Sequence, residues 1–175
     1  MHRSVTSKTL RWPRILLLAL ILTALPALGR AQTALPNQVA GTWRMVSATI
    51  DPQGEKRPAY GARPSGLLVF TPDLHYVEVL TEGDAPSFAS NARGQGTDAE
   101  NRRAMAGSIG HFGTYTVDET GAFSGNRVEG STFPNWVGHR RTTKELTLTV
   151  IGDRMYEEFT RPEGTKIVIE FERVR

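Results

Sequence analysis

The stretch KELTLTVIGDRMYEEFTRPEGTKIVIEFERV, residues 144–174, decides the fold. Apolar and polar residues alternate twice within it, at 146–150 and again at 167–171. A period of two places every second side chain on the same side of a sheet. Gly152-Asp153 and residues 162–164 separate the alternating segments and are short enough to be hairpin turns. The stretch therefore predicts three antiparallel strands at 144–152, 155–161 and 166–174.

Five more strands are predicted upstream of this stretch from runs rich in β-branched and aromatic residues. They lie at 39–50, 67–70, 75–80, 111–119 and 122–132. Strands and helices do not alternate along the chain, which argues against a parallel sheet. Closing sequential antiparallel strands into a barrel removes the sheet edges that would promote aggregation. The sequence predicts an all-β, eight-stranded antiparallel up-and-down barrel.

One short helix is expected at 97–109, within TDAENRRAMAGSI. Thr97 and Glu100 have the spacing of a capping box, in which each side chain bonds a free backbone N–H of the first turn. The helix is short and only weakly apolar, so it is predicted to be a lid or plug and not a core element.

The first 31 residues have the pattern of a secretory signal peptide. Five basic residues occur in this segment, and the apolar run ILLLALILTALPAL occupies 15–28. That run is short for a membrane span. Small residues at Gly29 and Ala31 predict cleavage between Ala31 and Gln32, and an uncleaved N-terminal anchor is the alternative. The sequence predicts export to the periplasm or the exterior, a linker at 32–38, a barrel domain at 39–175 and no transmembrane segment after cleavage.

Charge and cysteine content restrict the function further. The chain has 21 Lys and Arg against 18 Asp and Glu. Without residues 1–31 the count is 16 against 18, a net charge of −2. This balance argues against nucleic-acid binding, for which the only basic and aromatic cluster is His139-Arg140-Arg141 near Trp136. The absence of cysteine excludes disulfides and thiol chemistry.

No established catalytic or metal motif stands out. His75, His111 and His139 are isolated in sequence, so no metal site and no cofactor are expected. Carboxylate chemistry remains open, because Glu78, Glu129, Glu157 and Glu158 all lie within predicted strands. Arg127 and Glu129 share a parity and would polarise a ligand if they pointed inward, but an outward, solvated pair is favoured.

Several motifs resemble those of the bacterial and fungal lipocalin-like domain family, in order over residues 39–175. Gly41-Thr42-Trp43 resembles the lipocalin G-x-W signature, in which an arginine of the last strand packs across the tryptophan; Arg173 has that place here. The more specific segment is STFPNWVG at 131–138, whose matching residues are Ser131, Pro134, Trp136 and Gly138. Phe70 and Leu74 depart from the Tyr and Gly that are common in the family. A histidine that often precedes the strand glutamate is replaced around Asn126 or Arg127.

The resemblance and the strand pattern predict an exported protein that binds one small apolar molecule in a barrel cavity. The expected wall residues are Phe88, Met105, Phe112, Phe133 and Trp136, with Tyr76 and Arg127 as polar groups. Trp136 has two interpretations, since it would either cap the core or form the cavity mouth opposite the helix. The alternatives are a cofactor-free isomerase or cyclase using Glu129 and Arg127, and a filled barrel without ligand. A monomer is expected.

Overall fold

The computed structural model describes residues 36–51 and 54–175. The predicted signal peptide, its cleavage site between Ala31 and Gln32, and the first part of the predicted linker lie outside the described residues.

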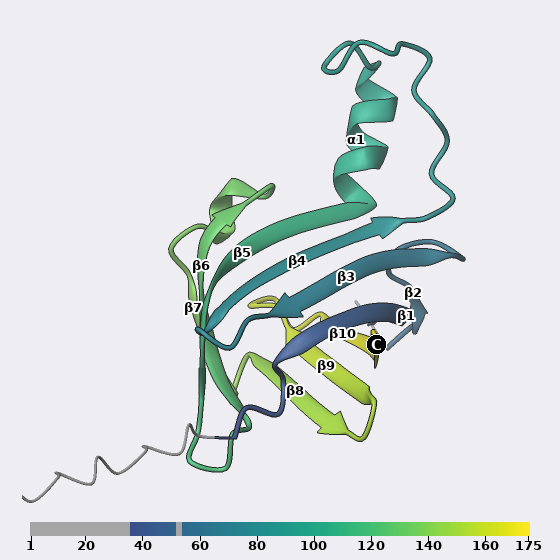
Figure 1. The fold of residues 1–175 in the computed structure, drawn as a ribbon. Coiled ribbons are helices and arrows are strands. Elements are labelled where there is room, and N and C mark those ends of the chain that lie inside the picture. The colour runs from purple at the N-terminus through teal and green to yellow at the C-terminus, as the bar shows by residue number, and fades with distance from the viewer. Residues whose placement is uncertain (1–35, 52–53) are drawn as a thin grey trace, which may run out of the picture. The chain divides into compact units, whose positions relative to one another are not determined.

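The described residues form one antiparallel sheet of ten strands. The strands are β1 (Gly41–Asp51), β2 (Arg57–Pro58), β3 (Pro64–Phe70), β4 (His75–Glu82), β5 (Ser108–Val117), β6 (Phe123–Ser131), β7 (Arg140–Thr142), β8 (Leu146–Ile151), β9 (Arg154–Thr160) and β10 (Lys166–Arg173). Their order is β7-β6-β5-β4-β3-β1-β10-β9-β8, and β2 pairs with β1. The pairing of β1 with β10 joins the two halves of the order, so the sheet curls into a nearly closed barrel (Figure 1).

The predicted all-β barrel is confirmed, and each of the eight predicted strands is present. The two additional strands, β2 and β7, are two and three residues long. Strands this short show no detectable alternation of apolar and polar residues. The sequence therefore indicated a loop at β2 and no element at β7.

The helix α1 (Asp98–Ala106) stands beyond the ends of β4 and β5, and does not lie on a face of the sheet (Figure 1). It ends three residues earlier than predicted, because Ser108 and Ile109 belong to β5. None of its residues is buried, so its order depends on local bonds. The Thr97 hydroxyl accepts from the Glu100 N–H, and the Glu100 carboxylate accepts from the N–H groups of Thr97 and Ala89. Arg103 donates to Glu82 on β4 at 2.7 Å.

We expect Thr97→Ala to loosen α1 without unfolding the barrel. Loss of an N-cap hydroxyl costs about 1 kcal/mol, which corresponds to roughly fivefold faster amide exchange in the helix. Hydrogen exchange followed by mass spectrometry would measure the rates, and Thr97→Ser is the matched control because it keeps the hydroxyl. Unchanged exchange in α1 of Thr97→Ala would contradict the proposed role of the cap.

The core is closed at one end by Trp43 of β1, which is fully buried. Its indole N–H donates to the Val39 carbonyl at 2.7 Å. The Arg173 guanidinium lies 4.0 Å from the centre of the indole ring and donates to the Ala40 carbonyl at 2.7 Å. This contact joins the first and last strands at the position that the G-x-W resemblance implied.

Candidate functional site

A cavity of about 870 Å³ opens in the barrel. Its apolar wall comes from several strands and includes Ile50, Leu80, Ile109, Phe159, Ile167 and Ile169. Exposed residues of three segments surround its mouth: α1, residues 133–136 and the turn between β9 and β10. The interior is therefore not filled by side chains, in contrast to the filled-barrel alternative.

Six side chains form what we call the interior polar cluster: Tyr60, Tyr76, Glu78, His111, Arg141 and Glu157. All of them except Tyr76 line the cavity, and Tyr76 joins them through His111. The parity of β4 places Glu78 inward, because Tyr76, Glu78 and Leu80 are buried while the residues between them are exposed. The same alternation in β9 buries Glu157 between Met155 and Phe159.

Glu78, His111 and Tyr76 form a buried chain of hydrogen bonds. Glu78 and His111 are direct cross-strand partners in β4 and β5. His111 Nε2 lies 2.6 Å from Glu78 Oε2, and His111 Nδ1 lies 3.1 Å from the Tyr76 hydroxyl. Both ring nitrogens have partners, so the imidazole is held in one orientation. Burial raises the pKa of Tyr76 well above its usual value, which keeps its hydroxyl protonated.

Glu157 is the second buried carboxyl of the cluster. Burial raises its pKa well above the usual value, the negative charge of Glu78 raises it further, and Arg141 opposes the shift. Glu157 therefore keeps its proton to a higher pH than an ordinary glutamic acid, and its O–H is then a donor beside Glu78. The pKa of Tyr60 is also raised, mainly by burial and then by the neighbouring carboxyl groups of Glu78 and Glu157.

The guanidinium of Arg141, on β7, lies over two aromatic rings that are nearly perpendicular to each other. The guanidinium carbon lies 4.5 Å from the centre of the Trp136 ring and 4.6 Å from that of Phe159. The residue is only 8% exposed, and its Nη2 has no hydrogen-bond partner among the described residues. Buried arginines are normally paired with acceptors, so this side chain has unused donor capacity.

We expect Glu157→Gln to change how stability depends on pH. A carboxyl whose pKa is higher in the folded than in the unfolded state stabilises the fold below its unfolded pKa, near 4.5. That contribution is lost as the pH rises through the raised, folded pKa. The variant should therefore gain stability relative to the parent as the pH rises above 4.5. Urea unfolding of both proteins from pH 4 to 9 measures the difference, and a difference independent of pH would contradict the raised pKa.

Three of the predicted wall residues line the cavity. These are Met105, Phe133 and Trp136. The predicted polar group Tyr76 does not line the cavity, but its hydroxyl is hydrogen-bonded to His111, which does. Trp136 therefore belongs to the cavity wall, and its ring also packs edge-on against His111 and Phe159.

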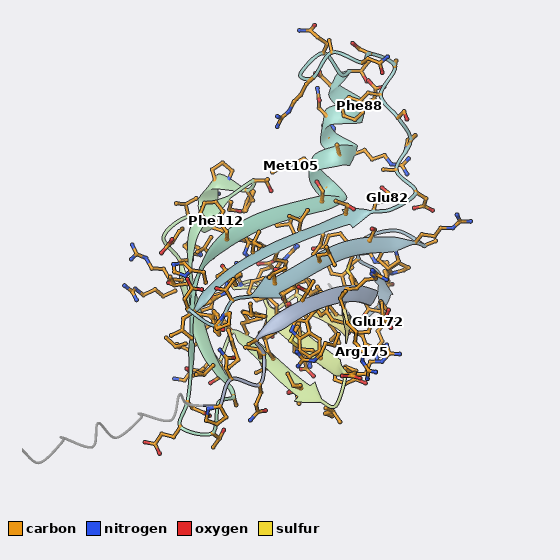
Figure 2. All side chains as sticks on the ribbon, in the orientation of Figure 1. Glu82, Phe88, Met105, Phe112, Glu172 and Arg175 are labelled. Carbon is orange, nitrogen blue, oxygen red and sulfur yellow. The ribbon has the colours of Figure 1, made fainter. Side chains whose placement is uncertain are left out.

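Phe88 and Phe112 do not line the cavity, and Arg127 and Glu129 have the outward facing that the sequence favoured, so Arg127 is not the expected polar group of the cavity. Phe112 is 53% exposed on the outer side of β5, and Phe88 packs against Gly96 in the loop beside α1 (Figure 2). Arg127 and Glu129 of β6 are both exposed and point outward. The cause lies in β6, where register shifts against β5 turn Val128 inward and its neighbours outward.

Sequence reasoning missed Glu78, His111, Arg141 and Glu157 as a group. The sequence did contain a signal for the two glutamates, since the residues two positions before and after each of them belong to the inward face. Arg141 gave no such signal, because its strand has only three residues.

Two further features are absent from the described part of the chain. No group of three or more histidine and carboxylate side chains there could hold a metal ion. In residues 36–51 and 54–175, no helix has the length and apolar character needed to span a membrane.

Comparison with known proteins places this barrel in a family. A redesigned β-barrel of known structure is similar in fold with a TM-score of 0.40 and 14% sequence identity; the match covers 79% of this chain and 93% of that one. No curated protein matches the sequence. The family described as a lipocalin-like domain matches residues 40–162. This match spans most of the barrel, from the first residues of β1 to the end of β9, and the chain belongs to the lipocalin-like domain family.

Proposed function

We propose that the protein binds one small, largely apolar molecule in the barrel cavity. The observation that carries this proposal is the cavity of about 870 Å³, which has an apolar wall and a small set of buried polar side chains. Ligand sites typically have this size and composition, with burial of apolar surface supplying affinity and polar groups fixing orientation. Met105, Phe133 and Trp136 would contact the ligand at the mouth.

We also propose that the protein acts outside the cytoplasm. The proposal rests on the sequence of residues 1–31, with basic residues before a short apolar run and small residues before the expected cleavage site. N-terminal sequencing of the protein from the periplasmic fraction of its host should begin at Gln32. A cytoplasmic protein that retains residues 1–31 would contradict the proposal.

A fluorescence titration tests ligand binding. The neutral apolar dye N-phenyl-1-naphthylamine should bind with a stoichiometry of one and brighten on leaving water. Ile109→Trp should abolish this signal, because Ile109 lines the cavity and an indole there would occupy it. Val79→Trp is the matched control. Val79 lies on β4 next to Leu80, the cross-strand partner of Ile109, but its side chain is exposed and faces outward. Absence of dye binding to the parent, or equal binding by both variants, would contradict the proposal.

The neighbouring carboxyls support a second candidate function, proton transfer on a bound carbon acid. Glu78 would act as the base and Glu157 as the acid, because burial raises the pKa of Glu157 and favours its protonated form. If the protein is an enzyme, its candidate catalytic residues are therefore Glu78 and Glu157, which line the cavity, and not Arg127 and Glu129.

The probe 5-nitrobenzisoxazole tests this candidate, because its ring opens when a base removes the C–H proton and the N–O bond breaks. Catalysis that is lost in Glu78→Gln and kept in Glu129→Gln would support proton transfer. A rate equal to that of buffer, or equal rates in both variants, would eliminate this candidate.

A further inference from the structure

The charge of Arg141 has no close partner of opposite sign. No Asp or Glu oxygen in the described residues lies within 4.0 Å of its guanidinium, whereas Glu78 is paired with His111 at 2.6 Å. Arginine stays charged at all ordinary pH values, so this group does not escape the cost of burial by losing its proton. The two aromatic rings stabilise the cation but offer no hydrogen-bond acceptor in the ring plane.

The charges around the cavity also favour an anion. Three arginines line it, Arg102, Arg141 and Arg161, together with three glutamates, Glu78, Glu157 and Glu163. Because its pKa is raised, Glu157 stays uncharged to a higher pH than an ordinary glutamic acid does. By formal count of arginines and glutamates, a neutral Glu157 leaves three positive groups against two negative ones in the lining.

The hydrogen-bonding groups near Arg141 point to the same kind of ligand. The Tyr60 hydroxyl lines the same cavity and stays protonated, so it is a donor as well. The interior polar cluster therefore offers several donors to a bound group, with the charged guanidinium as the strongest. A planar guanidinium pairs with the two oxygens of a carboxylate through parallel hydrogen bonds.

We propose that the cavity of this protein takes an apolar carboxylic acid, whose carboxylate pairs with the guanidinium of Arg141 beside Trp136 and Phe159 while its hydrocarbon body lies against the apolar wall. This inference rests on the proposed function and adds the chemical class of the ligand. Trp136 and Phe159 act as positioning residues, because both rings contact the guanidinium.

Displacement of N-phenyl-1-naphthylamine by two probes of equal chain length tests the proposal. Dodecanoate and dodecan-1-ol differ only in the head group. Because a hydrogen bond to a charged group is typically worth 1.5–3 kcal/mol, we expect dodecanoate to bind about tenfold tighter or more. Arg141→Met should remove that preference while leaving the affinity for dodecan-1-ol within about twofold, since both probes bury the same chain.

Arg140→Met is the matched control, because Arg140 precedes Arg141 in β7 and is exposed. It should keep the preference for dodecanoate. Arg141→Lys provides a second variant of the site, which keeps the charge but loses the planar fork, and should show a reduced preference.

The outcomes separate the two proposals. Dye binding with equal displacement by dodecanoate and dodecan-1-ol would overturn the carboxylate assignment and leave the binding function standing. The carboxylate assignment would also be overturned if Arg141→Met and Arg141→Lys both bind dodecanoate as the parent does. Absence of dye binding to the parent would overturn both proposals. If Arg141→Met lowers the melting temperature and no longer binds the dye, the Arg141→Lys result decides.

Discussion

Trp43→Ala should lower the free energy of unfolding by about 3–5 kcal/mol, the usual cost of removing a large buried aromatic side chain. Trp43 is fully buried, and its indole N–H donates to the Val39 carbonyl at 2.7 Å. The substitution also removes the surface on which the Arg173 guanidinium stacks at 4.0 Å. Because this stack joins β1 and β10, the loss should weaken the pairing between the two halves of the sheet.

Urea unfolding followed by circular dichroism measures the effect. Val46→Ala is the control, since Val46 lies on the same strand but is 41% exposed, and it should change stability by less than about 1 kcal/mol. A change below about 1 kcal/mol in Trp43→Ala would show that Trp43 does not close the core in the way described.

The second large effect is expected at Gly113 of β5. A Cβ atom at this position would collide with the Arg127 carbonyl oxygen of β6, a backbone atom that has no side-chain freedom to move away. Gly113 lies at the register shift between β5 and β6, so the two strands would have to separate there. We expect Gly113→Ala to cost about 3 kcal/mol, at the upper end of overpacking effects.

Gly110→Ala is the matched control on the same strand. Its added Cβ would lie 3.4 Å from a methyl group of Thr132, a side-chain neighbour that can adjust. Thermal unfolding of the two variants should therefore separate them clearly. Equal melting temperatures would contradict the close approach of β5 and β6 at Gly113.

The alternation of apolar and polar residues in the sequence predicted the longer strands of the barrel. Within residues 144–174, β8 and β10 could be predicted because their inward faces carry aliphatic or aromatic residues at every second position. The start of α1 was predicted from Thr97 and Glu100, and the structure has both bonds of that capping box. These signals come from residues close together in the sequence, so they can be recognised without knowing which strands pair.

The candidate site was harder to predict because it depends on register and on short elements. Arg127 and Glu129 share a parity with the buried Phe123, yet the shift between Thr116 and Val117 in the β5–β6 pairing turns them outward. Arg141 lies in a three-residue strand, where alternation has no meaning. The alignment of Glu78 with His111 follows from the register of β4 against β5, which a single sequence does not specify.

The β3–β4 turn contains one of the departures from the family pattern, a leucine where glycine is common. Leu74 has a φ of 67°, in the left-handed region that glycine adopts without steric cost. Its N–H donates to the Thr71 carbonyl and its carbonyl accepts from the Tyr115 N–H. The backbone conformation is thus kept by hydrogen bonds in this chain, although the residue is not glycine.

The most direct test of the proposed ligand site is native mass spectrometry of the protein purified from its own host. We predict a complex with one small molecule per chain, which on release proves to be an apolar carboxylic acid. The same preparation of Arg141→Met should be largely free of that molecule, and Arg140→Met should retain it. A parent protein without any bound molecule, and without affinity for N-phenyl-1-naphthylamine, would contradict the assignment of the cavity as a binding site.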